Sequence, residues 1–253
     1  MKIHFTASHS VLAQQSFAEL TKHYGQASLR DAEIVVALGG DGNVLHALYD
    51  SMDHGKPVFA IRRTDSVGFL CNDYKEGDLP ARLAAAQTVK LHPLRIEAVL
   101  EDGSTHSASA INEITVLRAS PQSVRLRVMV DGVERLSGYS GDGILVSTPA
   151  GSTAYNHSCG GPIMPLDSNT LVVTAISGYR PRGWSYAVLP QNAVTEIEVL
   201  EIEKRPVRVE AGASVLEKVA KARIWLDCKK DIALLFDPGA HLGERIIREQ
   251  FML

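Results

Sequence analysis

An unbroken apolar run that stops at a glycine-rich turn is the feature that most constrains the fold of this chain. Ile34–Leu38 contains no polar side chain, as is typical of a strand buried on both faces of a parallel sheet. Gly39, Gly40, Asp41 and Gly42 follow, and Asn43 is a candidate N-cap for a helix. A strand, a glycine turn and a helix together aim backbone N–H groups at an anion.

The carboxylate inside this turn needs a separate explanation. Asp41 would repel a phosphate, so we expect it to accept a proton or to hold a metal ion. The alternative is that residues 39–42 form only a tight turn at which a helix begins. The motif by itself does not separate the two interpretations.

Strands and helices alternate over the first part of the chain. Apolar runs at residues 2–6, 34–38 and 57–61 predict strands, and Ser10 and Asp78 are candidate N-caps. This alternation predicts a parallel sheet flanked by helices. We therefore expect an α/β domain over residues 1–92, with ligands beyond the carboxyl ends of the strands. The tail, residues 238–253, is expected to form a helix at 243–251 that packs back on this domain.

The second part of the chain changes to short strands. In residues 124–130, valine and leucine alternate with arginine and methionine, and Asp131-Gly132 is a hairpin turn signal. Further strands are expected at residues 94–100, 144–147, 171–175, 187–189, 194–200, 207–210, 223–226 and 232–236. Many short strands separated by turns predict an all-β, sandwich-like domain over residues 93–237.

Composition argues against several classes of partner. The 253 residues carry a formal net charge of −3 with a pI near 6.3, which argues against a basic nucleic-acid-binding surface. No apolar stretch approaches the ~20 residues that a membrane-spanning helix needs. Cys71, Cys159 and Cys228 are far apart and show no CxxC or zinc-ligand spacing. We expect reduced cysteines and a cytoplasmic protein without a nucleic-acid or membrane partner.

Asn112 and Glu113 interrupt an apolar, strand-like run. An ionised carboxylate only accepts hydrogen bonds, whereas an amide donates and accepts. The pair therefore suits a purine edge and ribose hydroxyls. The alternative, an exposed pair in a loop between two strands, stays open on the residues alone.

The longest signal begins with Gly141, Asp142 and Gly143 and continues from Ser147 to Pro162. It gathers small hydroxyl residues and glycines around one tyrosine, which offers many hydrogen-bonding groups to a closely approaching ligand. His157 is a candidate base within it, although a single histidine in a polar loop is more often a surface or packing residue. The chain has no GxGxxG fingerprint, GxxxxGK[ST] P-loop or GxSxG elbow.

In order and spacing, these three motifs closely resemble those of the NAD kinase family over most of the chain. Residues 67–70, Val-Gly-Phe-Leu, match that family's Leu-Gly-Phe-Leu segment, and the tail resembles an alphaproteobacterial branch. The glycine turn alone is not specific, because diacylglycerol and sphingosine kinases share a similar motif. The stretch from Ser147 to Pro162, together with Asn112-Glu113, is highly specific for the NAD kinase family.

The resemblance implies a fold and an activity. The fold is an α/β nucleotide-binding domain plus a β-sandwich-like domain that binds NAD. The activity is ATP-dependent phosphorylation of the 2′-hydroxyl of the adenosine ribose of NAD, which gives NADP. The resemblance also implies Mg2+ or another divalent cation arriving on ATP, no metal bound by the protein itself, and a homodimer or homotetramer.

Carried over by matching position, the resemblance makes Asp41 the general base. The implied NAD contacts are Asp41, Gly42, Phe69, Asn112, Glu113, Asp142, Ala150, Thr153, Ala154, Tyr155, Asn156, His157, Ser158 and Ala175. Asp142 is expected near the nicotinamide end, with a neighbouring subunit as a candidate source. The implied ATP-phosphate side consists of Gly39, Gly40, Asn43 and Arg63.

Three positions and one segment depart from the family pattern. Asn43 stands where threonine is usual, residues 62–66 replace a segment with Asn and Gly, Ser140 replaces a frequent Lys or Arg, and Ala213 replaces a polar residue. These departures bear on nucleotide affinity and phosphate donor more than on the reaction. Two other functions stay open: a lipid kinase, which the hydroxyl-rich residues 147–158 argue against, and a non-catalytic NAD(P) sensor, which the retained Asp41 argues against.

Overall fold

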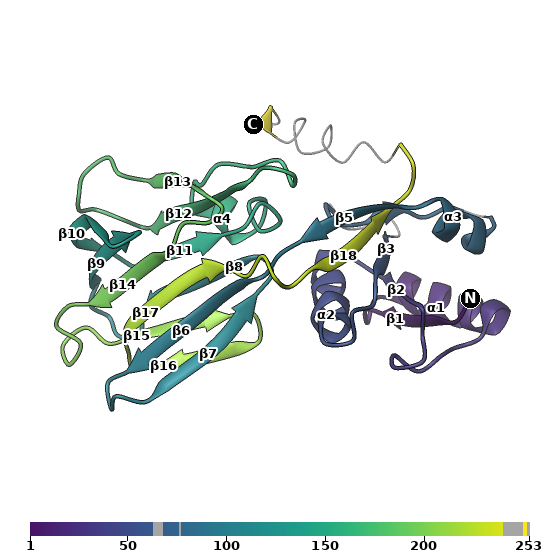
Figure 1. Ribbon diagram of the computed structural model, residues 1–253, viewed down its shortest axis with the longest axis horizontal. Helices are drawn as coiled ribbons and strands as arrows, with labels where there is room; N and C mark the ends of the chain where they lie inside the picture. Colours follow the sequence, from purple (N-terminus) through teal and green to yellow (C-terminus); the bar gives the residue numbers. More distant parts are fainter. Residues whose placement is uncertain (63–67, 76, 240–249, 252–253) are drawn as a thin grey trace. The chain divides into compact units, whose positions relative to one another are not determined.

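The computed structural model describes residues 1–62, 68–75, 77–239 and 250–251. The chain divides into two compact units (Figure 1). The first combines Met1–Leu91 with the segment that begins at Lys230, and the second runs from His92 to Lys229.

The first unit is built on a largely parallel sheet. Its strands, in spatial order, are β1 (Ile3–Ala7), β2 (Ile34–Leu38), β3 (Val58–Arg62), β18 (Ile232–Phe236) and β5 (Gln87–Leu91), with β4 (Asn72–Asp73) beside β3. Each pair is parallel except β18 with β5. All five residues of β2 are buried, which confirms a strand covered on both faces.

The helices of this unit begin at the capping residues that the sequence indicates, with one exception. Ser10 caps α1 (Val11–Tyr24), and Asp78 caps α3 (Leu79–Ala85). The cap prediction for Asn43 is wrong, because Gly40 is the N-cap of α2 (Asp41–Met52). Gly40 already has the extended backbone of a cap, with φ −89 and ψ −176. The Asn43 amide instead donates to the carbonyl oxygen of Leu38 at 3.2 Å.

Strand β18 belongs to the first unit and not to the sandwich domain in which the sequence placed it. Leu234 pairs with Val58 of β3, and Ile232 pairs with Leu91 of β5. Four of the five residues of β18 are buried, which fits the interior of a sheet covered on both faces. The boundary between the units therefore lies near residue 230 rather than residue 237.

Within the described residues, the second unit is a sandwich of two antiparallel sheets. One has the order β10 (Val133–Gly141), β9 (Val124–Val130), β14 (Thr195–Val199), β17 (Val219–Leu226), β6 (Leu94–Leu100) and β7 (Thr105–Ala110). The other has the order β13 (Tyr186–Pro190), β12 (Thr170–Ile176), β11 (Gly143–Ser147), β8 (Glu113–Arg118), β15 (Val207–Ala211) and β16 (Ser214–Glu217). The predicted sandwich-like domain is thus confirmed.

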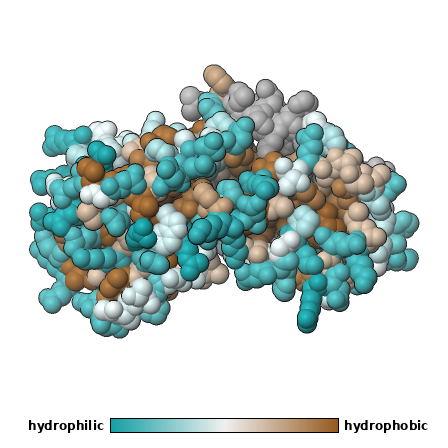
Figure 2. All heavy atoms as spheres, viewed as in Figure 1, coloured by the Kyte–Doolittle hydropathy of each residue, from teal (hydrophilic) through white to brown (hydrophobic). Residues whose placement is uncertain are grey.

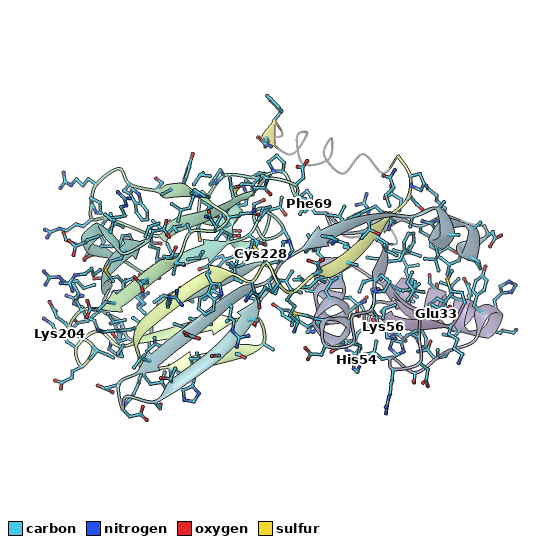
Figure 3. The ribbon with its side chains drawn as sticks, in the orientation of Figure 1. Glu33, His54, Lys56, Phe69, Lys204 and Cys228 are labelled. Atoms are coloured by element: carbon cyan, nitrogen blue, oxygen red, sulfur yellow. The ribbon has the colours of Figure 1, made fainter. Side chains whose placement is uncertain are left out.

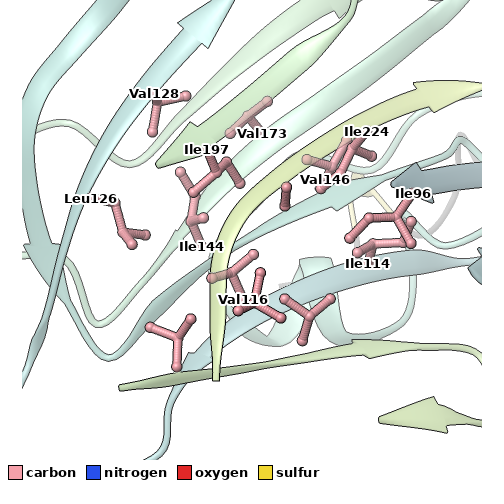
Figure 4. Packing of buried hydrophobic residues seen from close by; sticks show 14 of the residues in the cluster. Ile96, Ile114, Val116, Leu126, Val128, Ile144, Val146, Val173, Ile197 and Ile224 are labelled. Atoms are coloured by element: carbon pink, nitrogen blue, oxygen red, sulfur yellow. The ribbon is translucent and has the colours of Figure 1, made fainter. Parts of the chain in front are cut away.

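One apolar core fills the sandwich. Figure 4 shows Leu126 and Ile197 of one sheet in the same cluster as Ile144 and Val173 of the other. Because side chains alternate along a strand, the inward-facing Ile114 of β8 directs its neighbour Glu113 to the outer face of the sheet.

The described surface gives no sign of a membrane-spanning helix. Polar and charged side chains cover much of the face of the sandwich drawn in Figure 2. None of the described helices is both long and apolar enough to cross a membrane.

The predicted helix at 243–251 and its packing on the first domain fall almost entirely outside the described residues.

Candidate active site

The turn between β2 and α2 leaves no room for a side chain at its first position. Gly39 has φ +148, and a Cβ there would lie 2.8 Å from Ser8 Oγ, so only glycine fits. The Gly39 N–H donates to the carbonyl oxygen of Ile61 at 3.0 Å, which ties the turn to the carboxyl end of β3. At Gly42, by contrast, a Cβ would meet no described atom within 4 Å. This exposed position is open to a ligand at the N-terminus of α2.

Asp41 is the first residue of α2, and a second turn of the same unit holds its side chain. Its Oδ2 accepts the backbone N–H of Phe69, and its Oδ1 accepts that of Leu70, both at 2.9 Å. Phe69 is labelled in Figure 3. An ionised carboxylate offers about four acceptor positions, and Asp41 is partly exposed. The carboxylate can therefore accept a further hydrogen bond from a ligand.

The structure brings together most of the residues expected in the first unit. Gly39, Gly40, Asp41, Gly42, Asn43 and Phe69 all lie at the carboxyl end of β2. Arg63, expected at the ATP phosphates, lies outside the described residues. Among the described residues, no group of three or more His, Cys, Asp or Glu side chains is arranged to hold a metal ion.

In the second unit, Asn112 and Glu113 are not an exposed loop pair. Asn112 Oδ1 and Glu113 Oε2 are buried and have no hydrogen-bond partner among the described residues. Burial raises the pKa of Glu113 to about 7. Buried oxygens without a partner are rare in folded proteins, so these two acceptors are available to donors of a ligand.

The loop at residues 148–162 packs directly against this pair. The Thr148 hydroxyl donates to the carbonyl oxygen of Ile111 at 2.7 Å. The backbone N–H of Thr148 donates to the carbonyl oxygen of Asn112 at 2.9 Å. A Cβ at Gly151 would overlap the backbone of Asn112. The glycine thus allows the loop and the Asn112-Glu113 pair to meet closely.

Asn156 differs from the other residues expected to contact NAD. It has no exposed surface, and its Nδ2 donates to the carbonyl oxygens of Ser152 at 3.1 Å and Pro162 at 2.9 Å. Its Oδ1 accepts the hydroxyl of Thr174 at 2.7 Å. Asn156 is therefore engaged in holding the loop, and its polar atoms are not presented to a ligand.

The other expected residues of this unit are accessible to different degrees. Tyr155, His157 and Ser158, all in α4 (Tyr155–Ser158), are exposed. Thr153 and Ala154 are partly exposed, whereas Ala150 and Ala175 are buried.

Asp142 occupies a fixed turn between β10 and β11. Its carboxylate accepts from Arg118 Nε at 2.6 Å, and its N–H donates to the carbonyl oxygen of Ile176 at 2.9 Å. The buried Tyr139 hydroxyl donates to the carbonyl oxygen of Gly143 at 2.6 Å. Asp142 is therefore held through its carboxylate and its backbone N–H, and Tyr139 holds the residue that follows it.

The roles of two supporting residues escaped the sequence reasoning. Leu70 lies in the segment 67–70 that resembles the family's, but it contributes a backbone N–H, which leaves no trace in side-chain type. Arg118 lies in a stretch that the sequence singled out, but its ion pair joins strand β8 to a turn after β10. Such pairings depend on the sheet register and cannot be read from local pattern.

Comparison with known proteins decides the family. Residues 111–232 match the sequence model of the ATP-NAD kinase C-terminal domain. The chain is 44% identical over 251 residues to the NAD kinase of Hyphomonas neptunium, covering 99% of this chain and 98% of that protein. It is 41% identical over 251 residues to the NAD kinase of Brucella suis, covering 99% and 97%. The chain belongs to the NAD kinase family.

Solved structures of NAD kinases show the same fold. Yeast NADH kinase complexed with NADH aligns with a TM-score of 0.79 at 19% identity, covering 99% of this chain and 87% of that one. An NAD kinase from Archaeoglobus fulgidus in complex with ATP aligns with a TM-score of 0.73 at 22% identity, covering 99% and 97%. The expected NAD kinase-like fold is confirmed, and the alphaproteobacterial relatives agree with the resemblance of the tail.

Proposed function

We propose that this chain uses ATP and Mg2+ to phosphorylate the 2′-hydroxyl of the adenosine ribose of NAD, giving NADP, with Asp41 as the general base. Membership of the NAD kinase family supports phosphorylation of NAD by ATP. The base assignment is carried by the Asp41 carboxylate, which two backbone N–H groups hold at the N-terminus of α2 with acceptor positions to spare.

The reaction needs a base because a ribose hydroxyl is a poor nucleophile near neutral pH. Asp41 takes the hydroxyl proton as the ribose oxygen bonds to the γ-phosphorus of ATP. The bond from that phosphorus to the bridging oxygen breaks, and ADP leaves. A positioned base contributes about 10²–10⁴ in rate.

Asn112 and Glu113 are proposed to bind the adenosine part of NAD. Their buried, unpartnered side-chain oxygens support this role, because hydroxyl and amine donors of a nucleoside would relieve the cost of leaving them unpaired. Thr153, Ala154, Tyr155, His157 and Ser158 add accessible groups from the adjoining loop. Asp41, Gly42 and Phe69 are the proposed NAD contacts of the first unit.

The ATP phosphates are proposed to bind at Gly39 and Gly40, where α2 begins. Mg2+ typically keeps several waters and binds through substrate phosphates rather than through an all-protein cage. The cation is therefore proposed to enter with ATP. When bound, the cation neutralises charge on the transferring phosphoryl group.

Two further proposals are a cytoplasmic location, which the widely spaced cysteines support, and a homodimer or homotetramer, which the resemblance to the family supports. In such an assembly, Asp142 of a neighbouring subunit would reach the nicotinamide end of NAD. Sedimentation velocity with and without NADP measures the assembly, and a monomer under both conditions would rule it out.

One assay separates the proposed kinase from its two rivals. The chain is incubated with NAD, ATP and Mg2+, and NADP is measured, with parallel reactions that contain diacylglycerol in place of NAD or polyphosphate in place of ATP. NADP formation that requires NAD and ATP supports the proposal. Phosphorylated diacylglycerol would indicate a lipid kinase, and NAD binding without NADP formation would indicate a sensor.

A further inference from the structure

We propose that the turn from Gly68 to Cys71 is a positioning device for Asp41. The turn fixes the carboxylate so that its remaining acceptor positions face the hydroxyl that it deprotonates. This inference rests on the assignment of Asp41 as the general base. It gives Phe69 and Leu70 a backbone role that is separate from any contact of their side chains with NAD.

The carboxylate is held at two points. Oδ2 accepts the N–H of Phe69 and Oδ1 accepts the N–H of Leu70, each at 2.9 Å. The terminal torsion of an aspartate has a broad energy minimum, so one hydrogen bond would leave the carboxylate free to rotate. One donor on each oxygen fixes both its position and its rotation, as a base in a near-attack geometry requires.

The turn itself is anchored in the sheet. It is closed by a hydrogen bond of 3.1 Å from the N–H of Cys71 to the carbonyl oxygen of Gly68. The next residue, Asn72, is buried and donates through its Nδ2 to the carbonyl oxygens of Ala60 and Leu235, both at 3.0 Å. These bonds attach the end of the turn to β3 and β18, which belong to the same sheet as β2, the strand that leads into α2.

Gly68 is the residue that permits this geometry. It has φ +58, a conformation that L side chains rarely adopt, and a Cβ there would lie 2.5 Å from Arg62 Cδ. Any larger residue must displace the turn or Arg62. The glycine therefore lets the turn place the two amides without strain in the turn or displacement of Arg62.

The side chain of Cys71 makes a third contact with the Asp41 carboxylate. Its Sγ is fully buried and lies 3.5 Å from the carbonyl oxygen of Gly39 and 3.8 Å from Asp41 Oδ1. The thiol therefore fills the space between the turn and the start of α2. This weak contact adds to the two amide hydrogen bonds on the carboxylate.

Removal of a single N–H tests the proposal directly. Leu70 is replaced by its α-hydroxy analogue, which turns the amide into an ester and deletes the donor while keeping the side chain. We expect kcat to fall about tenfold to a hundredfold, with KM for NAD and for ATP unchanged within about twofold. The control is the α-hydroxy analogue of Ala27, whose N–H donates to the carbonyl oxygen of Ile3, also at 2.9 Å. It should lower thermal stability comparably and leave kcat unchanged.

A second pair of variants needs no unnatural residue. Gly68→Ala should lower kcat without raising KM. Gly55→Ala is matched in backbone strain, because Gly55 has φ +61, but a Cβ there meets no described atom within 4 Å. Its kcat should equal that of the wild type.

The outcomes distinguish this inference from the function on which it rests. If Asp41→Asn abolishes turnover while the Leu70 ester and Gly68→Ala keep wild-type kcat, the positioning proposal is overturned and the base assignment stands. If Asp41→Asn retains turnover, the base assignment fails and the positioning proposal fails with it.

Discussion

Asn156 Oδ1 accepts the hydroxyl of Thr174 at 2.7 Å, and neither side chain has any exposed surface. This hydrogen bond ties the loop at residues 148–162 to strand β12 of the sandwich. Because Asn156 also binds the carbonyl oxygens of Ser152 and Pro162, one buried amide secures the loop at three places. The conformation of the proposed NAD-binding loop therefore depends on a residue that is hidden from the ligand.

Asn156→Ala should destabilise the chain by about 2–4 kcal/mol, because it leaves three buried polar groups without their partner. Thr174→Val, which removes one of the three hydrogen bonds, should cost about 1–2 kcal/mol. His157→Ala is the control, since the adjacent His157 is exposed. Urea unfolding measures all three variants, and equal stabilities of Asn156→Ala and His157→Ala would contradict the structural role of Asn156.

Glu113 should make stability depend on pH. Burial raises its pKa to about 7 from an ordinary 4.5, so between these values the folded chain holds a proton that the unfolded chain has lost. Stability therefore falls as pH rises through this window. Glu113→Gln should be more stable than wild type by up to about 3 kcal/mol at pH 8 and should match it at pH 4.

Chemical denaturation across this pH range measures the Glu113 effect. The exposed Glu97 gives the matched control through Glu97→Gln. A Glu113→Gln advantage that does not grow with pH would show that the carboxyl is not buried as described.

Gly39 and Gly42 should respond in opposite ways to alanine. Gly39→Ala should destabilise the chain by about 2 kcal/mol or more, since its φ of +148 and the proximity of Ser8 exclude a Cβ. Gly42→Ala should fold as well as wild type or better, because a Cβ there meets no described atom and alanine favours the helix by about 1 kcal/mol. The variant should nevertheless raise KM for NAD, because Gly42 is a proposed NAD contact. Unchanged kinetics of a stable Gly42→Ala would place the ligand elsewhere.

Asp237 should stabilise the first unit in a pH-dependent way. Burial alone would raise the pKa of this carboxyl, but hydrogen bonds from Arg82 and Lys75 outweigh burial and hold the pKa below its ordinary value. The stabilisation is therefore present above the ordinary pKa and is lost as pH falls through the lowered one. Asp237→Asn should cost about 2–4 kcal/mol at pH 7, with a smaller difference in strong acid.

The exposed pair of Asp231 with Lys90 gives the matched control for Asp237. Asp231→Asn should cost less than about 1 kcal/mol. Equal losses at the two positions would show that Asp237 behaves as an ordinary surface charge.

Local pattern predicted those parts of the fold that depend on neighbouring residues. The apolar run of β2 and the caps Ser10 and Asp78 appear in the structure where the sequence puts them. The sheet to which β18 belongs was not predictable, because its apolar run suits either domain and only its pairing with β3 and β5 decides. The edge strands β7, β10 and β16 were missed since few of their residues are buried and the strands show no apolar alternation.

The candidate site likewise combines residues that the sequence pattern reveals with contacts that it does not reveal. Asp41 and the pair Asn112-Glu113 stand out because their side-chain types are unusual for their places in an apolar strand or glycine turn. The amides that hold Asp41 and the internal role of Asn156 come from contacts between distant segments. Side-chain type alone cannot distinguish a polar residue that binds a ligand from one that binds its own loop.

The central claim is that Asp41 takes the proton from the ribose hydroxyl, and turnover by Asp41→Asn tests it most directly. Asparagine keeps the shape of the side chain but is a far weaker base, and its NH2 group cannot accept one of the two backbone N–H groups that hold Asp41. Its kcat should fall at least about a hundredfold, with the Kd for NAD unchanged within about threefold, while the exposed Asp50→Asn on the same helix retains wild-type turnover. Near-normal NADP formation by Asp41→Asn would contradict the account.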